Sequence, residues 1–300
     1  HRHCRGLRPA PSPAAAATVA LPARLAHPGE ASVSDAASSS LLAEIARAFR
    51  CPFVPGALTR LARAEGYLEV VWPRVRSSVE TAGFLGSGLY MADMALDAVE
   101  AVYEPVMTRE DLRAAGLSDA DLDALVSVVD VFHYTQPQVL LVLAALAEAF
   151  EKDRVGGYGK PEPRAVSERE AAHLATPVAF APPEAGLLPA IAEAMGLAAP
   201  PDLYRALARW PAYLGVAWEE LQHLVAYPDF RRRGRGLYYY ARSGARFLAE
   251  PLEANPAALR AAGLTESAIA EAKAALDEVL PAQAMMLMHA EAIRTGLAPP

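Results

Sequence analysis

Apolar residues recur at helical spacing along most of this chain. Leu41, Leu42, Ile45 and Phe49 follow a period of three to four residues, after a serine-rich stretch that can cap a helix. The same period marks further helices across residues 58–72, 91–102 and 119–150. The alternating pattern of a half-buried strand is absent from the sequence. The pattern therefore predicts an all-α protein.

This apolar pattern occurs twice. A shift of 146 positions aligns one set of residues with identical residues between 187 and 218: Leu41, Leu42, Ile45, Ala46, Ala48, Pro55, Leu61, Ala62, Arg63, Tyr67, Leu68, Val70 and Trp72. A shift of 147 positions aligns Leu112–Leu117 with Leu259–Leu264, and Gln136 with Gln283. Because both copies keep the same apolar residues, they predict one helical unit used twice. We therefore expect a tandem-repeat helical pseudo-dimer.

The repeat divides the chain into four parts. Residues 1–34 are rich in Ala, Pro, Arg and Ser without a period, which predicts a disordered or expression-derived extension. Residues 35–150 form the first helical repeat, and residues 187–300 form the second. Between them, residues 151–186 are dense in Gly and Pro, which predicts a crossover linker.

Composition excludes several classes of partner. With 53% hydrophobic and 21% charged residues, a chain of 300 residues can bury a large core. A net charge of −7 argues against nucleic acid. The longest apolar run, Val139–Ala147, is too short to cross a membrane. The two cysteines, Cys4 and Cys51, imply neither a disulfide framework nor a thiolate metal site, so we expect a cytoplasmic protein.

One acidic residue breaks the repeat. Asp202 stands opposite Gly56 at the shift of 146 positions, so only one copy carries a carboxylate there. Asp202 also follows two prolines and precedes a helical pattern, and capping of that helix alone would explain an aspartate at this place. An ionisable residue that only one repeat carries is also a candidate for function. A carboxylate between apolar repeats can act as a general base.

A polar cluster interrupts the apolar helix over residues 119–150. Pro137 lacks the N–H that would bind the carbonyl of His133, so we expect a kink there. Kinks often border cavities, which makes Tyr134, Thr135 and Gln136 candidates for a binding site beside His133. A structural histidine at a helix break is the competing interpretation. No histidine or cysteine has a companion at metal-ligand spacing, so we expect no metal.

With the repeat and these two clusters in view, the chain resembles the group I 2-haloacid dehalogenases, the family that handles both D and L substrates. The resemblance runs from about residue 36 to the C-terminus. It is carried by these blocks: Arg50-Cys-Pro-Phe-Val54 leading to Gly66-Tyr-Leu68 and Trp72, Phe132-His-Tyr-Thr-Gln-Pro137 before Leu140-Leu141, Arg154-Val-Gly-Gly157, and Pro201-Asp-Leu203 leading to Ala208-Arg-Trp-Pro211.

The resemblance implies an all-α pseudo-dimer with its active site between the repeats. It also implies that an aspartate at the position of Asp202 activates a water, which attacks C2 of the haloacid directly and inverts it. Five positions differ from the family. His133 replaces an asparagine that helps to hold the water, and Phe53 replaces a pocket tryptophan. Gly56, Pro201 and Gln283 replace a phenylalanine, a serine and a tyrosine.

We therefore predict a hydrolytic dehalogenase of 2-haloalkanoic acids, with Asp202 as general base and His133 positioning or sharing the water. The expected pocket residues are Phe53, Gly56, Tyr134, Gln136, Pro201, Gln283 and Leu287. Gly56 should enlarge the pocket and favour bulkier acids. No cofactor is expected, and the expected partner is a small halogenated carboxylic acid, with a homodimer as an option.

Two alternatives stay open. In the first, Asp202 and His133 activate water toward another small anionic substrate. In the second, the chain is a catalytically silent helical protein that binds a small acid, and Asp202 is only a cap. Halide release separates the dehalogenase from both alternatives, and ligand-induced thermal stabilisation without turnover favours the silent protein.

Overall fold

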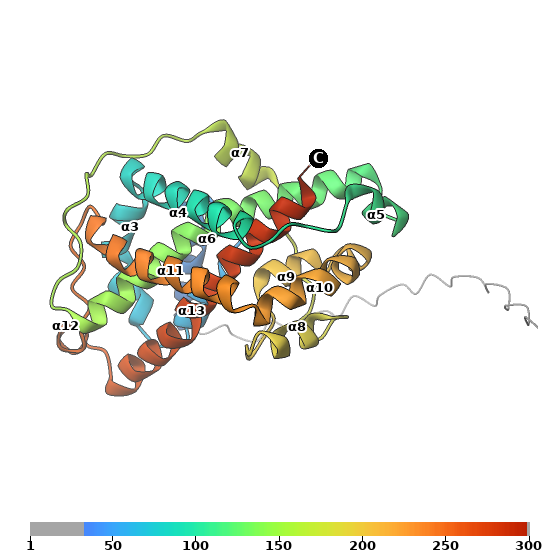
Figure 1. Ribbon diagram of the computed structural model, residues 1–300. Helices are drawn as coiled ribbons and strands as arrows, with labels where there is room; N and C mark the ends of the chain where they lie inside the picture. The colour runs from blue at the N-terminus through green and yellow to red at the C-terminus, as the bar shows by residue number, and fades with distance from the viewer. Residues whose placement is uncertain (1–32, 299–300) are drawn as a thin grey trace, which may run out of the picture.

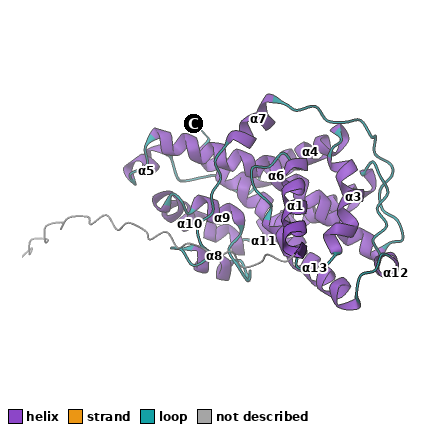
Figure 2. Ribbon diagram, turned by 180° about the vertical axis from the view of Figure 1, so that it is seen from behind, coloured by secondary structure: helices purple, strands orange, loops and turns teal. Residues whose placement is uncertain are grey.

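The computed structural model describes residues 33–298, which are almost entirely helical (Figure 1). Two isolated β-bridges, Thr81 with Pro163 and Val155 with Leu252, are the only strand-like pairings in that range, and Figure 2 shows no strand. The prediction of an all-α fold is confirmed. The helices are α1 (Val33–Ala48), α2 (Gly56–Leu61), α3 (Tyr67–Val79), α4 (Ala82–Glu100), α5 (Arg109–Ala114), α6 (Asp119–Glu151), α7 (Glu168–Ala175), α8 (Leu188–Ala194), α9 (Asp202–Leu207), α10 (Pro211–Ala226), α11 (Pro228–Gly244), η1 (Ala245–Phe247), α12 (Pro256–Ala261) and α13 (Glu266–Leu297).

The helices of the two repeats follow one another in the same order. The short helices α2 and α9 begin 146 positions apart, at Gly56 and Asp202, and the long helices α6 and α13 begin 147 positions apart. Residues 1–32 of the predicted extension lie outside the described residues, whereas Val33 and Ser34 begin α1. The single helix expected across residues 58–72 is two helices, because Gly66 adopts a left-handed φ of 73° between α2 and α3.

Both repeats contribute to one hydrophobic core. Helix α6 of the first repeat packs most extensively against α13 of the second, and α4 and α11 pack against this pair (Figure 1). A capping box of Ser118 and Asp121 starts α6. Helix α6 then continues through Pro137 to Glu151, so the proline does not end it. The repeats are therefore interleaved, and the space between them is bounded by α6 and α13.

The crossover segment between the repeats is held against the helices. The backbone N–H of Ala82 donates to the carbonyl of Glu162 at 2.8 Å, and Val155 pairs with Leu252. Arg164 is buried and donates to Gln138 of α6 at 2.8 Å and to the carbonyl of Ala48 at 2.9 Å. The predicted linker therefore contributes buried polar contacts as well as chain connection.

No helix within residues 33–298 combines the length and the apolar character needed to cross a membrane. Across those same residues, His, Cys, Asp and Glu side chains do not gather in groups of three or more that would suit a metal ion. The thiol of Cys51 is buried and free.

Candidate active site

A cavity of about 690 Å³ lies between the two repeats. Its walls include equivalent faces of the two long helices, at positions i, i+3, i+4 and i+7 in each. Helix α6 contributes Phe132, Thr135, Gln136 and Val139. Helix α13 contributes Val279, Ala282, Gln283 and Met286, which are the residues 147 positions further on. The cavity therefore follows the internal symmetry of the chain, and the starts of α2 and α9 complete its wall.

Asp202 is a charged residue of the cavity wall that has no charged equivalent in the other repeat. It is the first residue of α9, and its carboxylate Oδ2 accepts a hydrogen bond from the backbone N–H of Gly56 at 2.7 Å. Gly56 is the first residue of α2. The side chain makes no capping bond to its own helix, whose N-cap is Pro201. The expected cap of α9 is therefore wrong, and the carboxylate instead satisfies the start of the equivalent helix in the other repeat.

The surroundings of Asp202 favour a basic carboxylate. Burial raises the pKa of Asp202, whereas the Gly56 N–H and the Arg205 guanidinium act in the opposite direction, and the net pKa is above the ordinary value. The Asp202 side chain is 23% exposed, and Nη1 of Arg205 lies 3.6 Å from its Oδ1 atom. A carboxylate with a raised pKa is a better proton acceptor once it is ionised. The environment of Asp202 therefore suits a general base.

Arg205 is fixed at the cavity wall by the crossover segment. Its Nε donates to the carbonyl of Ala181 at 3.0 Å, and its guanidinium lies 5.3 Å from the ring centroid of Phe180. Phe180 in turn meets Phe53 edge-on at 5.1 Å, and Phe53 also lies 5.1 Å from Phe132. Near Asp202 the site thus combines the Arg205 cation with three phenyl rings, a lining that suits a small organic anion. Arg60, Arg63 and Glu278 also line the cavity, and Arg60 pairs with Glu278 at 3.1 Å.

One residue of the cavity wall has a buried polar atom without a protein partner. Gln283 Nε2 donates to the backbone carbonyl of Gln136 at 3.2 Å, which joins α13 to α6. The side-chain Oε1 of Gln136 is buried and accepts no hydrogen bond from the described residues. Buried polar atoms are nearly always hydrogen-bonded, so this oxygen is an available acceptor for a water or ligand in the cavity.

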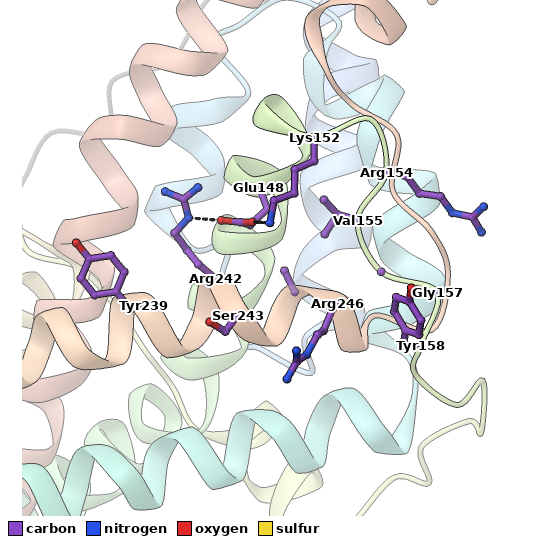
Figure 3. A pocket seen from close by; sticks show the side chains of 12 residues that line it. Glu148, Lys152, Arg154, Val155, Gly157, Tyr158, Tyr239, Arg242, Ser243 and Arg246 are labelled. Atoms are coloured by element: carbon purple, nitrogen blue, oxygen red, sulfur yellow. Dashed lines mark hydrogen bonds and ion pairs between the residues drawn. The ribbon is translucent and has the colours of Figure 1, made fainter.

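A larger hollow of about 920 Å³ lies elsewhere, between the end of α6 and the end of α11 (Figure 3). Its buried carboxylate is Glu148, which accepts hydrogen bonds from Arg242 and Lys152. Burial alone would raise the pKa of Glu148, but these two cations bring it below the ordinary value. A carboxylate neutralised by two cations is a poor base, so the smaller cavity is the better candidate.

Comparison with known proteins gives a consistent set of relatives. No protein-family model matches the chain. It is 30% identical over 99 residues to an (R)-2-haloacid dehalogenase of Pseudomonas putida, which covers 32% of each protein. It is 27% identical over 187 residues to a configuration-inverting 2-haloacid dehalogenase of Pseudomonas sp. (strain 113), covering 59% of this chain and 60% of the relative. A configuration-inverting 2-haloacid dehalogenase of Alcaligenes xylosoxydans xylosoxydans is 25% identical over 197 residues, 61% of this chain and 64% of its own.

Solved structures show the same fold. A D-2-haloacid dehalogenase mutant in complex with D-2-CPA matches with a TM-score of 0.80 at 18% identity, covering 87% of this chain and 92% of that one. A D-2-haloacid dehalogenase in complex with L-LA matches with a TM-score of 0.79 at 19% identity, over the same shares of both chains. This chain is a divergent relative of the 2-haloacid dehalogenases. It spans less than two thirds of the length of each curated relative that it matches.

The structure brings most of the expected pocket residues of this dehalogenase relative together. Phe53, Gly56, Gln136, Pro201 and Gln283 line the cavity with Asp202. The expected extra space beside Gly56 is, however, not empty. A Cβ atom at Gly56 would lie 2.7 Å from Asp202 Oδ2, so the carboxylate occupies the volume that a side chain would take. The prediction that Gly56 enlarges the pocket is therefore wrong.

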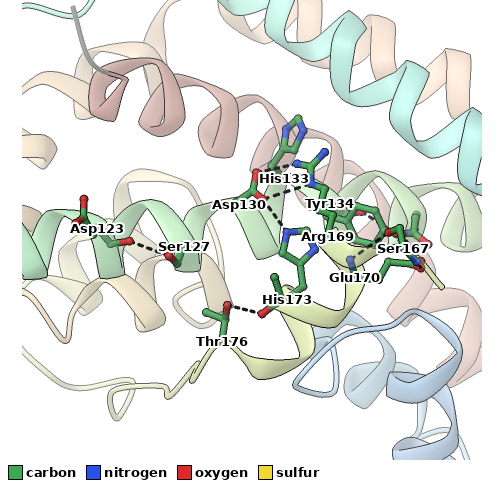
Figure 4. A network of polar contacts seen from close by, with 12 residues as sticks. Asp123, Ser127, Asp130, His133, Tyr134, Ser167, Arg169, Glu170, His173 and Thr176 are labelled. Atoms are coloured by element: carbon green, nitrogen blue, oxygen red, sulfur yellow. Dashed lines mark hydrogen bonds and ion pairs between the residues drawn. The ribbon is translucent and has the colours of Figure 1, made fainter.

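His133 and Tyr134 do not line the cavity. Figure 4 shows both among the polar side chains around Asp130, where α6 meets α7. His133 Nδ1 lies 2.6 Å from Oε1 of Glu291, which is fully buried, and Tyr134 donates to Glu170 of α7. Successive helical residues are rotated by about 100°, so the face that contains Phe132 turns both side chains away from the cavity. The predicted convergence of His133 and Asp202 on one water is wrong.

Leu287 is the second expected pocket residue, after Tyr134, that lies elsewhere. It is fully buried in the core and is absent from the cavity wall, because the α13 face that contains Gln283 and Met286 turns it inward. Sequence reasoning also missed Arg205 and Phe180. Helical spacing around Gln136 would have predicted the α6 face, which consists of Phe132, Thr135, Gln136 and Val139. Adding 147 to these residue numbers would have predicted the α13 face. No sequence signal marked Phe180, which lies in the presumed linker.

Proposed function

We propose that this protein hydrolyses 2-haloalkanoic acids to 2-hydroxy acids and halide, with Asp202 as the general base. The observation that carries the proposal is the Asp202 carboxylate, held between the repeats with a raised pKa in a cavity lined by phenyl rings. The relatives support it, since two are named as configuration-inverting 2-haloacid dehalogenases. The similar D-2-haloacid dehalogenase structures include a complex with D-2-CPA.

In the proposed reaction, Asp202 accepts a proton from a water while the water oxygen attacks C2 of the substrate. The carbon–halogen bond breaks on the opposite face, so the configuration at C2 inverts and the halide leaves with the bonding electron pair. The proton on Asp202 then passes to solvent. His133 takes no part, because its side chain is bound to Glu291 outside the cavity.

The cavity also offers groups that suit the other parts of the substrate. The guanidinium of Arg205 is the fixed cation nearest to Asp202 and can bind the substrate carboxylate. The free Oε1 of Gln136 can accept a hydrogen bond from the water and orient it. The rings of Phe53, Phe132 and Phe180 exclude bulk solvent from the reacting carbon.

A binding protein without catalysis is the second candidate. The bond from Gly56 to Asp202 favours it, because this bond satisfies the start of α2 and would exist without any chemistry. The hydrolase of another small anion loses its main support, since Asp202 and His133 do not meet. The proposal includes a cytoplasmic location, in keeping with the free Cys51 thiol, and a homodimer stays a prediction.

Purified protein given each enantiomer of 2-bromopropionate is expected to release bromide and to form lactate of inverted configuration. In a single turnover in ¹⁸O-water, the label should enter the lactate and not the protein, because water attacks carbon directly. Mass spectrometry of the product and of the peptide that contains Asp202 measures both. Label in the Asp202 carboxylate would instead show an ester intermediate. Thermal stabilisation by the acids without bromide release would favour the binding protein.

A further inference from the structure

We infer that Gly56 positions the general base: its N–H group and its missing side chain together fix the Asp202 carboxylate. The kinetic part of this inference rests on the proposed function, whereas the geometric part does not. The N–H of Gly56 donates to Oδ2 of Asp202 at 2.7 Å. A Cβ atom built on Gly56 would lie 2.7 Å from Oδ2, 3.0 Å from Oδ1 and 3.1 Å from Cγ.

Space, not backbone conformation, requires glycine at this position. Gly56 is absent from the residues with positive φ, so its backbone is one that any residue adopts. The nearest atoms to the hypothetical Cβ all belong to the Asp202 carboxylate. The methyl group of Gly56→Ala would therefore have one principal effect: it would push the Asp202 carboxylate away from the N–H of residue 56, which donates a hydrogen bond to it.

The broken symmetry of the repeats follows from this contact. The shift of 146 positions pairs Gly56 with Asp202, and the structure brings these two equivalent residues into direct contact. Two aspartates would direct two carboxylates into one space, and two glycines would leave no base. One repeat therefore supplies the carboxylate, and the other supplies the N–H and the room for it.

Displacement of the carboxylate has a predictable electrostatic result. The Gly56 N–H stabilises the ionised form of Asp202 and opposes the effect of burial on its pKa. When that hydrogen bond is lost, the pKa of Asp202 should rise further. The reaction needs the ionised base, so the acidic limb of the pH–rate profile should move to higher pH, and misplacement of the base should slow the reaction.

The first test compares Gly56→Ala with Gly215→Ala. Gly215 lies in α10, where an added Cβ would meet no atom within 4 Å. We expect Gly56→Ala to lower kcat for bromide release by about 10-fold to 100-fold and to move the acidic limb upward. Gly215→Ala should change neither. The Asp202 carboxyl can be titrated in ¹³C-carboxyl-labelled protein, with its signal assigned by its loss in Asp202→Asn. Its pKa should be higher than in the parent in Gly56→Ala, and equal to that of the parent in Gly215→Ala.

The second test needs no activity. If the added methyl group meets only the carboxylate, Gly56→Ala should lower the Tm of the parent but not the Tm of an Asp202→Ala variant. An equal effect in both backgrounds, or an unchanged Asp202 titration in Gly56→Ala, would overturn the inference. If the parent released no halide from any acid while the titration and Tm results held, the proposed function would fail and the positioning role of Gly56 would stand.

Discussion

Replacement of Asp202 by asparagine is expected to lower the rate of halide release by about 10²-fold to 10⁴-fold, the usual contribution of a general base. Asparagine keeps an oxygen that can accept the Gly56 N–H, but it cannot take a proton from water at neutral pH. The loss should therefore appear in kcat, with little change in the affinity for the acid. Initial rates of bromide release, measured with a halide electrode at saturating substrate, give the comparison.

Asp119→Asn is the matched control for this variant. Asp119 is the first residue of α6, as Asp202 is the first residue of α9, but its side chain is 75% exposed and pairs with Arg113 on the surface. The Asp119→Asn variant should therefore release bromide at the parent rate. A rate for Asp202→Asn within about threefold of the parent would contradict the general-base role, since that role requires a loss of at least 10²-fold.

The same variant should not be less stable than the parent at neutral pH. Because the folded pKa of Asp202 is raised, the folded state binds more protons than the unfolded state as pH rises through the two pKa values. Ionisation of Asp202 therefore reduces the free energy of unfolding above its unfolded pKa. Removal of the charge relieves this cost, so lost activity with unchanged or higher stability is the expected combination.

The repeat pattern predicted the fold and pointed to Asp202 and Gly56, whereas Phe53 and Pro201 entered the candidate site through the family resemblance. Identical apolar residues 146 positions apart marked the helices, and an aspartate opposite a glycine within the aligned blocks marked Asp202. The symmetry also placed Gln136 and Gln283 on equivalent faces. The helices are encoded locally, in the period of apolar residues, and the equivalent positions follow from comparing the two copies, so both can be read without three-dimensional information.

The rest of the site depends on contacts that a local pattern does not contain. Neighbouring residues on α6 point in directions about 100° apart, so the His133 cluster could not be assigned to one wall before the partner of α6 was known. Phe180 reaches the cavity because the crossover segment folds back onto Arg205. The closeness of Asp202 and Gly56 arises only from the pairing of the repeats.

Arg164→Met is expected to lower the free energy of unfolding by about 3–5 kcal/mol, because it leaves a buried carboxylate without its cation. The Arg164 side chain is 1% exposed, and its Nη2 lies 3.4 Å from Oε1 of Glu170, whose side chain is fully buried. The same guanidinium joins α6, through Gln138, to the end of α1, through the carbonyl of Ala48. Methionine keeps the length of the side chain and removes all of these donors.

Arg76→Met is the surface control for this loss. Arg76 also binds two partners, Glu44 at 3.0 Å and Glu80 at 3.1 Å, but its side chain is 46% exposed. Solvent screens such pairs, so its replacement should cost less than about 1 kcal/mol. Urea unfolding followed by circular dichroism measures both variants under the same conditions.

A double variant separates the lost charge pair from lost packing. In Arg164→Met combined with Glu170→Gln, the buried carboxylate is gone. Glutamine keeps one oxygen that can accept from the Ser167 N–H, and its NH2 group can donate to the Tyr134 hydroxyl. The double variant should therefore be more stable than Arg164→Met alone. Equal stability of the two, or a loss in Arg164→Met no larger than in Arg76→Met, would show that Arg164 does not hold the crossover segment to α1 and α6 through its charge.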